Sequence, residues 1–274
     1  HHPATVRRKR LMASTVLMRD VLWRASTLLM DTEPQFHRNT EHDMVDAAND
    51  AASAIAKFVP GACSRVDAIK LRPGTLQTIA EIAAADCKPG DGSAPTLPII
   101  GNSVLDPICN MGTDGLTPGR VIRVVDSKTL DAQDPVWHTA TGAAVKSIAF
   151  DPLTPRYFQV YPGVPVPTAV WIRLAYTAQP LKIPNTGTAG SELYALAGTS
   201  TQTLTIADEF ADDVVNYIVA RMCMRPSEWS DASKGSAFAS MFTGSLNAKV
   251  LAITGNNPNL QFLQFDPASA GRAK

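Results

Sequence analysis

The sequence predicts an α+β fold: a four-helix bundle of two N-terminal and two C-terminal helices, a small antiparallel β barrel or sandwich inserted between the two pairs, and an extended C-terminal tail. Amphipathic helical patterns occupy both ends of the 274-residue chain. The middle is rich in turn residues, since 15 of the 20 prolines and 13 of the 17 glycines lie between residues 60 and 205. Both residues interrupt helices and favour turns.

The first helix is predicted within residues 18–31, which read MRDVLWRASTLLMD. Its apolar positions form a stripe beside Trp23: Val21, Leu22, Leu28 and Leu29. Pro34 follows three residues later and is expected to stop the helix, because proline cannot donate an intrahelical hydrogen bond. Leu28 and Leu29 are therefore expected to face the core.

The second helix is predicted within residues 40–61. Thr40 is the expected N-cap, and Asp43 lies in the first turn, where an acidic side chain favours the positive end of the helix dipole. One face recurs with the helical period: Met44, Ala48, Ala51, Ala52, Ile55 and Val59. Pro60 and Gly61 end the pattern, so the two helices form the N-terminal pair.

The middle of the chain alternates between apolar and polar residues, as β-strands do. In residues 169–180 one face would carry Val170, Ile172, Leu174 and Tyr176. The segments YFQVYPG at 157–163 and GRVIRVVDS at 119–127 also read as strands, separated by Pro-Gly turns. The segment EIAAAD at 81–86 fits a strand or a short helix equally well.

The C-terminal pair begins at residues 208–224, where acidic residues load the start and Arg221 lies near the end. Asp208 is the expected N-cap. The stripe of this helix is Phe210, Val214, Tyr217, Ile218 and Met222. After Pro226 a last helix is predicted from about residue 230 to 253, with one apolar side formed by Phe238, Met241, Phe242, Leu246, Val250 and Ile253.

These patterns give a domain organisation. Residues 12–60 and 206–254 form the helical bundle, because neither pair alone has enough apolar face to stand. Residues 61–205 form the inserted β domain, and residues 255–274 form an extended arm. Residues 1–11 are predicted to be an irregular extension before Met12. Its basic run Arg7–Arg10 leaves open the alternative of an arm that contacts DNA or an acidic partner.

The charge balance and the cysteine spacing argue against several classes of function. Lys plus Arg and Asp plus Glu both total 25, whereas a dedicated nucleic-acid binder usually has a basic surplus. The four cysteines have no zinc-binding spacing and are read as reduced, small apolar residues. No apolar run reaches the roughly 18 residues that a membrane span needs. The sequence therefore predicts no membrane association and no metal site.

Motifs of known enzyme chemistry are missing from the sequence, including GxSxG, HExxH, Walker and GxGxxG patterns. His37 and His42 are five residues apart, which is not the helical spacing that holds one metal. The pair Asp212–Asp213 is explained by the helix dipole and the pair Asp131–Asp134 by turn chemistry. His138 beside Trp137 is expected to be half-buried. No catalytic residue and no cofactor is predicted.

Two groups of residues are candidates for contacts between subunits. Leu260, Phe262, Leu263 and Phe265 would be costly to expose in a free tail, so the tail either folds back on its own domain or joins a neighbouring subunit. Small residues that allow close helix contact form the second group: Ala48, Ala52, Ala232, Gly235 and Ala239. The alternative for this second group is packing inside one subunit.

Several segments resemble the head-to-tail adaptor, or connector, proteins of short-tailed bacteriophages. They include AANDAASAIAKFVPGACSRVDAIKLRPGTLQTI, NMGTDGLTPGR, DPLTPRYFQVYPGVP, WIRLAYTAQP, DEFADDVVNYIVARMCMRPSEWSDASKGSAFASMF and GNNPNL. The likeness runs from about Leu17 to Leu263 and does not cover residues 1–11.

The resemblance implies a virion structural protein without catalytic residues, assembled in the host cytoplasm. Such adaptors form a ring, commonly of twelve copies, below the portal protein; the ring continues the DNA channel and carries the tail nozzle and fibres. Two other functions stay open: another tail component of the same virion, and an enzyme acting on polymers with a β binding module.

Overall fold

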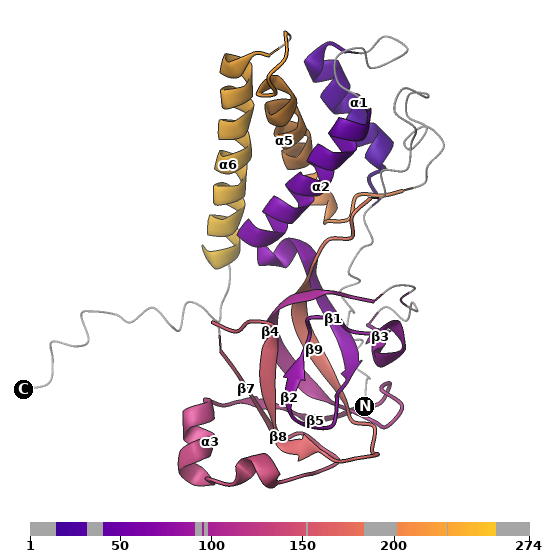
Figure 1. Ribbon diagram of the computed structural model, residues 1–274, viewed down its shortest axis with the longest axis vertical. Coiled ribbons are helices and arrows are strands. Elements are labelled where there is room, and N and C mark those ends of the chain that lie inside the picture. Colours follow the sequence, from indigo (N-terminus) through magenta and orange to yellow (C-terminus); the bar gives the residue numbers. More distant parts are fainter. Residues whose placement is uncertain are drawn as a thin grey trace, which may run out of the picture. The chain divides into compact units, whose positions relative to one another are not determined.

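The computed structural model describes residues 15–31, 41–90, 95, 98–151, 153–183, 202–228 and 230–255. The chain divides into two compact units. The β unit is built from Cys63–Gln179, and the helical unit combines Ser14–Ala62 with the chain from Pro180 onward. Helices and strands are both present, so the predicted α+β class is confirmed (Figure 1).

The helical unit contains four longer helices, among the residues described: α1 (Met18–Leu29), α2 (Glu41–Phe58), α5 (Ala211–Cys223) and α6 (Ala232–Gly255). A short 3-10 turn, η4 (Asp208–Phe210), precedes α5. Helix α5 packs against each of the other three (Figure 1). Helices from both ends of the chain therefore bury their apolar faces against one central helix.

The predicted apolar face of α2 is confirmed. Met44, Ala48, Ala51, Ala52, Ile55 and Val59 are each at most 4% exposed. The predicted stripe of α1 is only half right, because Val21 and Leu22 are buried while Trp23 is 52% and Leu28 is 41% exposed. The buried stripe runs instead through Met18 and Ala25, since the helix ends at Leu29 and its last turn extends past the core.

The C-terminal end of α1 closes without glycine or proline. Met30 adopts the left-handed conformation at φ 56° and ψ 39°. The N–H of Asp31 donates to the Ser26 carbonyl at 3.0 Å, and the N–H of Met30 donates to the Thr27 carbonyl at 3.1 Å. These are the two bonds of a Schellman motif, which accounts for a helix end that Pro34 was expected to supply.

Asp208 does not lie at the N-cap of α5, contrary to the prediction. Phe210 occupies that position and makes no side-chain cap bond. The Asp208 carboxylate accepts the N–H of Thr15 at 3.0 Å and the N–H of Val16 at 3.3 Å. Asp208 lies in the 3-10 turn that precedes α5, so its carboxylate does not reach the first amides of that helix. It binds the backbone at Thr15 and Val16 instead.

The β unit contains two sheets. Its strands are β1 (Ser64–Lys70), β2 (Gly74–Thr78), β3 (Cys87–Pro89), β4 (Gly101–Met111), β5 (Pro118–Val121), β6 (Arg123–Val124), β7 (Ser147–Phe150), β8 (Tyr157–Val164) and β9 (Trp171–Ala178). One sheet has the order β3-β1-β9-β4-β5 and the other β2-β8-β7-β6. Neither closes into a barrel among the described strands, so the barrel alternative of the prediction does not hold.

The segment 119–127, predicted as one strand, forms two strands in different sheets. Residues 118–121 pair with β4, and residues 123–124 pair with β7 in parallel. A parallel pair needs a long crossover, which helix α3 (Ser127–Gln133) and the loop after it provide. The sheets are therefore not purely antiparallel. The ambiguous segment 81–86 forms an isolated bridge at Ile82 and a 3-10 turn at 84–86.

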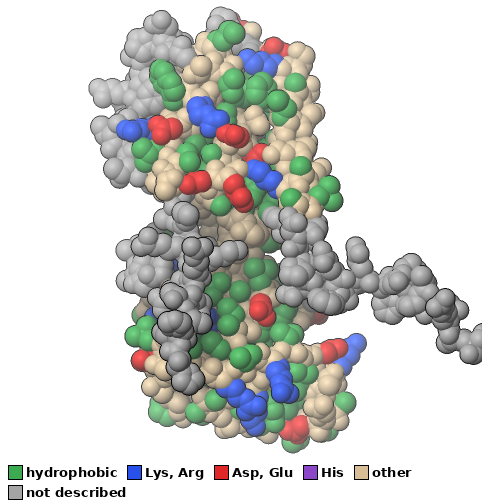
Figure 2. Space-filling model, turned by 180° about the vertical axis from the view of Figure 1, so that it is seen from behind, with side chains coloured by type: hydrophobic (Ala, Val, Ile, Leu, Met, Phe, Trp, Pro, Cys, Tyr) green, Lys and Arg blue, Asp and Glu red, His purple; other side chains and the backbone are tan. Residues whose placement is uncertain are grey.

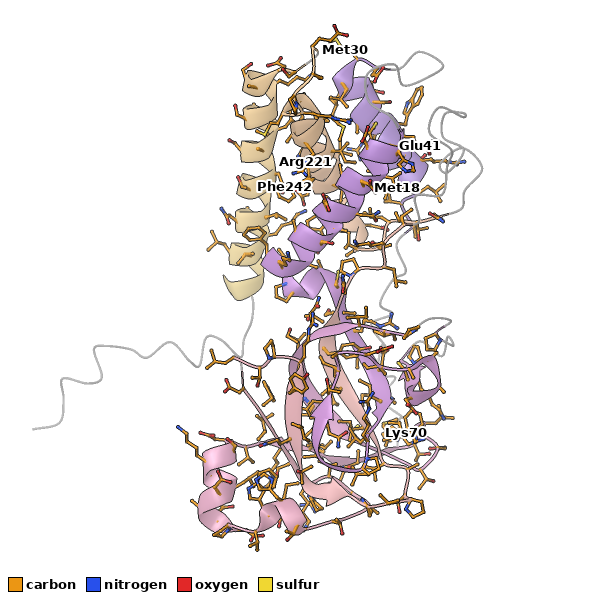
Figure 3. The ribbon with its side chains drawn as sticks, viewed as in Figure 1. Met18, Met30, Glu41, Lys70, Arg221 and Phe242 are labelled. Carbon is orange, nitrogen blue, oxygen red and sulfur yellow. The ribbon has the colours of Figure 1, made fainter. Side chains whose placement is uncertain are left out.

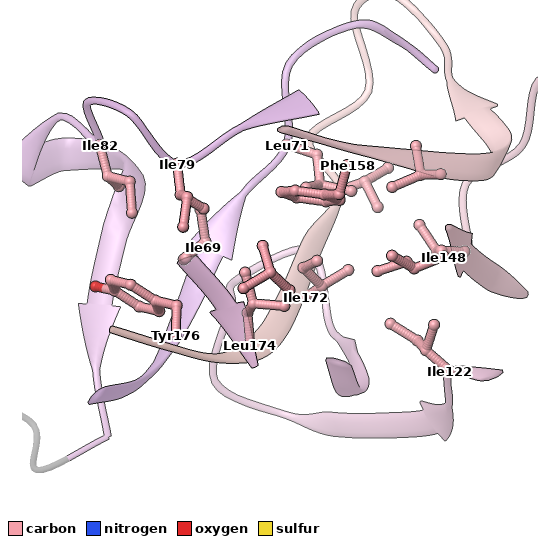
Figure 4. Close-up of a cluster of buried hydrophobic side chains, with 14 of the residues drawn as sticks. Ile69, Leu71, Ile79, Ile82, Ile122, Ile148, Phe158, Ile172, Leu174 and Tyr176 are labelled. Atoms are coloured by element: carbon pink, nitrogen blue, oxygen red, sulfur yellow. The ribbon is translucent and has the colours of Figure 1, made fainter. Parts of the chain in front are cut away.

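One apolar core joins the two sheets (Figure 4). The predicted inward face of β9 is confirmed, with Ile172, Leu174 and Tyr176 all 0% exposed and Val170 3% exposed. From the other sheet come Ile148 and Phe158, among others. The two sheets therefore stabilise one another through a single buried layer of large side chains.

A buried carboxylate closes one end of this core. Asp67 is 3% exposed; its Oδ2 accepts the Tyr176 hydroxyl at 2.7 Å and the Arg65 Nε–H at 2.9 Å. Burial, followed by the nearby Asp67 charge, raises the pKa of Cys87 to about 12 and the pKa of Tyr176 far above its usual range. Buried charge is tolerated only when it is hydrogen-bonded, and this network satisfies it.

Candidate interaction surfaces

The side of α6 that faces away from α5 carries no charged side chain among the described residues. The helix has only two charged residues, Lys234 and Lys249, and both turn inward. The Lys234 ammonium donates to the Leu28 carbonyl at 2.7 Å. The Lys249 ammonium donates to the Glu209 carbonyl at 2.6 Å and pairs with the Asp213 carboxylate.

The exposed side of α6 is uncharged. One stripe of it consists of Ala237, Met241, Gly244, Ala248 and Leu251, which we call the α6 outer face, and exposed Ser240 and Asn247 lie beside it. Met241 is 58% and Leu251 is 71% exposed. Surface helices usually carry charged residues on the solvent side, so a neutral stripe over four turns is suited to contact with another protein surface.

The opposite side of α6 is held firmly to α5. Phe242 points toward α5, where its ring meets Tyr217 edge-on with centroids 5.1 Å apart (Figure 3). Gly235 lies so close to α5 that a Cβ atom there would come within 2.8 Å of the Met224 side chain. These contacts fix which side of α6 faces outward.

Helix α1 and the residue after it also expose large apolar side chains, which point to different sides of the helix. Trp23 is 52%, Leu28 is 41% and Met30 is 79% exposed, and we call these three together the α1 outer face. Helices α1 and α6 lie on either side of α5 (Figure 1). The helical unit therefore exposes large apolar side chains on α6 as well as on and just after α1.

The small residues singled out from the sequence have different environments. Ala48 and Ala52 belong to the buried face of α2, at 1% and 4% exposure. Gly235 is buried against α5, Ala239 is half-buried and Ala232 is exposed. The tail residues Leu260, Phe262, Leu263 and Phe265 lie outside the described residues.

A charged hollow of about 440 Å³ lies between α2 and α5. Three aspartates of α2 line it, namely Asp43, Asp46 and Asp50. Arg221 of α5 and Arg225, just after that helix, line it as well. Arg225 pairs with Asp43 at 2.5 Å and Arg221 with Asp50 at 4.0 Å. Acidic and basic side chains also alternate over the face of the helical unit in Figure 2, and such exposed pairs contribute little stability.

The side chains considered for chemistry have structural surroundings. Asp131 accepts the Trp137 indole N–H at 2.8 Å, and Asp134 accepts the N–H of Val136 at 3.2 Å. His138 is exposed, not half-buried as predicted, because it stacks on the outer side of the Trp137 ring with centroids 3.8 Å apart. In the other acidic pair, Asp212–Asp213, the Asp212 carboxylate forms an ion pair with Arg24.

Three of the four cysteines have unreactive surroundings, because burial raises the pKa of the Cys63, Cys87 and Cys223 thiols and keeps them protonated. The four cysteines are free thiols, three of them buried. Burial raises the pKa of the Cys63 thiol to about 11. Across the described ranges, no group of three or more His, Cys, Asp or Glu side chains is placed to hold a metal ion. None of the helices described is long and apolar enough to cross a bilayer.

The model of the SU10 adaptor protein family matches residues 18–261, which span the helices and both sheets. The chain belongs to the SU10 adaptor protein family. SU10 adaptors are phage proteins, so the chain is a structural adaptor of a virion, and the resemblance to phage head-to-tail adaptors is confirmed. No curated protein matches the chain.

Sequence reasoning missed two surfaces of this SU10 adaptor. The α1 outer face was read as part of the core stripe, because Leu28 fits the helical period. The second surface is the exposed pair of strands β5 and β6, which was read as one strand. In the sequence, the feature that indicated a surface at β5 and β6 was the pair of cations Arg120 and Arg123, which are three residues apart.

Proposed function

We propose that this SU10 adaptor forms a ring of twelve copies below the portal protein at the head-to-tail junction. The four helices act as one bundle that builds the wall of the ring. The inserted region 61–205 serves the tail side, where nozzle and fibre proteins attach. The arm 255–274 grips the portal through Leu260, Phe262, Leu263 and Phe265.

The pair of outward faces on the helical unit supports the ring. Identical copies close into a ring when one face binds a different face of the next copy. The α6 outer face is uncharged and carries Met241 and Leu251 among small residues, and the α1 outer face carries Trp23, Leu28 and Met30. Apolar side chains of one copy can pack against those of its neighbour, as the apolar interfaces of permanent assemblies require.

Charge balance supports passage of DNA through the ring without retention. The chain carries equal numbers of basic and acidic residues, and Arg221 and Arg225 are paired with aspartates. Cations that are already paired have little capacity to displace the counterions of DNA. The role is structural and involves no catalysis and no cofactor; the same virion placement implies assembly in the host cytoplasm.

Mass photometry of the chain with portal rings of the same virus tests the ring. We expect a species with twelve adaptors per portal ring. The double variant Met241→Glu/Leu251→Glu should abolish it, because two carboxylates would be buried without partners. Phe58→Glu is the matched control, since Phe58 is a 60% exposed apolar residue of the same unit outside both faces. Full assembly of the double variant would contradict the proposal.

Deletion of residues 256–274 tests the arm separately. We expect a folded chain that no longer co-sediments with portal rings. Hydrogen exchange of α5, unchanged by the deletion, would verify folding. A truncated chain that still co-sediments with portal would show that the arm is not needed for attachment.

A further inference from the structure

Residues 118–124 form an outer edge of both sheets in the β unit. Strand β5 is the last strand of one sheet and β6 is the last strand of the other. Only Ile122 separates them; it is 4% exposed and points into the shared core (Figure 4). Ile122 therefore anchors the segment while both strands stay at the surface. We call residues 118–124 the β5–β6 edge.

The β5–β6 edge is exposed along both strands. Every residue of β5 and of β6 is exposed, and Val121 is 68% and Val124 is 53% exposed. Within the described chain, β5 has only β4 as a strand neighbour and β6 has only β7. An edge of this kind presents backbone groups that can pair with another extended chain.

Two cations belong to this edge, Arg120 and Arg123. A third, Lys146, is joined to it through the backbone, since the Arg123 N–H donates to the Lys146 carbonyl at 3.2 Å, while the Lys146 ammonium lies over the Tyr161 ring of β8, 5.9 Å from its centroid. The Asn110 amide fixes their spacing by donating to the Arg120 carbonyl at 3.1 Å and to the Val145 carbonyl at 2.7 Å. Basic side chains also gather on one face of the β unit in Figure 2.

These cations lack acidic partners in the described part of the chain. The ion pairs of the β unit are Arg65 with Asp67 and Lys70 with Asp86, and neither involves the edge. Cations on an edge strand prevent two copies from pairing edge to edge, because like charges would face each other. The same charges favour a strand that carries carboxylates.

We propose that the β5–β6 edge binds an extended acidic peptide segment of another virion protein, which adds to the edge as a strand. Carboxylates would face Arg120 and Arg123, and apolar side chains would cover Val121 and Val124. A DNA backbone could satisfy the cations but would leave both valines and the strand backbone groups without partners. The identity of the partner as a virion protein rests on the proposed function, whereas the affinity for such a peptide does not.

Fluorescence anisotropy of the full chain with a labelled Glu-Val-Glu-Val-Glu-Val-Glu peptide tests this inference. We expect binding that is about tenfold weaker when proline replaces each valine, because the proline peptide keeps its charge but cannot pair as a strand. The variant Arg120→Glu/Arg123→Glu should lose about tenfold in affinity. Lys128→Glu is the control, since Lys128 is an exposed cation on α3 of the same unit, and it should bind normally.

Equal binding of the two peptides, or of the two variants, would overturn the inference. Binding of a short DNA duplex that the double variant abolishes, with no peptide binding, would also overturn it and would mark a nucleic-acid contact. If the charge-reversed chain fails to fold by circular dichroism, Arg120→Gln/Arg123→Gln replaces it. Ring assembly on the portal is measured on the same proteins, so failure of peptide binding with intact rings separates this inference from the proposed function.

Discussion

In the helical unit both lysines of α6 turn inward, whereas in the β unit Arg120, Arg123 and Lys146 stand at the surface without a described acidic partner. The first arrangement leaves a neutral face, which suits a permanent contact between identical copies. The second leaves a charged edge, which suits a partner of opposite charge and a salt-sensitive contact. The difference shows that a chain with no net charge can still have one uncharged surface and one basic surface.

The cores of the two units differ as well. The β unit is filled by large side chains such as Ile148, Phe158 and Ile172. The helical unit also buries large side chains, such as Leu22, Phe210 and Ile218, and adds the alanines of α2 and close helix contact, as at Gly235. Lost volume should therefore destabilise either unit, and crowding should matter most where helices approach closely.

Ile172→Ala is expected to have the largest effect. Ile172 is 0% exposed in the central strand β9, so truncation removes buried methyl groups and leaves a cavity that costs about 4 kcal/mol. Hydrogen exchange measured by mass spectrometry should show lower protection of β1, β4 and β9, with α5 unchanged. Val166→Ala, at a residue 75% exposed, should leave both units unaffected. Equal loss of protection in α5 would contradict independent cores.

Lys249→Met is expected to destabilise the helical unit by about 3 kcal/mol, because it leaves the Asp213 carboxylate, 2% exposed, without its cation. Urea denaturation, followed through the hydrogen exchange of the α5 amides, would measure this loss of stability. Adding Asp213→Asn should restore part of the loss, since the buried charge is then absent. The exposed pair Arg225–Asp43 is the control: Arg225→Met should cost about 0.5 kcal/mol. A similar cost for both pairs would show that burial is unimportant here.

Alkaline pH is expected to weaken the β unit by about 2 to 3 kcal/mol between pH 8 and pH 10. Folding raises the pKa of Cys63 to about 11 and that of Cys87 to about 12, and also raises the pKa of Tyr176, so the folded state keeps protons that the unfolded state loses. Stability is therefore complete below the unfolded pKa of the thiols and falls as pH rises above it. Urea denaturation at both pH values measures this, and Cys87→Ala should reduce the slope. An unchanged slope would contradict the assignment to Cys87.

Gly235→Ala and Gly244→Ala form the smallest and most closely matched test, since both lie in α6. A Cβ at Gly235 would come within 2.8 Å of Met224, whereas nothing lies within 4 Å of one at Gly244. We expect Gly235→Ala to destabilise the helical unit by about 1 kcal/mol and Gly244→Ala to stabilise it by a similar amount. Thermal unfolding of both variants measures the difference. The same sign for both would show that Gly235 is not crowded.

Regular periodicity explains what the sequence could predict. The buried faces of α2 and β9 follow a single period over at least two turns or four strand positions, and each lies where the pattern indicates. The break between β5 and β6 could not be predicted, because it falls at Ile122 with neither glycine nor proline. An isoleucine at this position fits a continuous strand. The chain passes from one sheet to the other there only because a second sheet lies beside the first.

The surfaces were harder to predict because they depend on contacts distant in sequence. The sequence placed Met241 on the same apolar side of α6 as Phe242 and Leu246, but Met241 is 58% exposed while the other two are buried. Helix α6 is rich in small residues on all sides, so periodicity alone did not separate the outward stripe. That choice follows from Phe242 against Tyr217 and from Lys249 against Asp213, which are 36 residues apart. The prediction of Asp208 as an N-cap was wrong for a related reason, because its carboxylate binds the Thr15 amide, which is 193 residues away in the sequence.

The first and last strands of the β unit are antiparallel neighbours, with Ser64 opposite Thr177. The chain thus enters and leaves this unit at adjacent points. A segment with adjacent ends can be exchanged for another of different length at little entropic cost to the remaining chain. The β unit can therefore change in length or sequence while the helices on either side of it in the chain keep their packing.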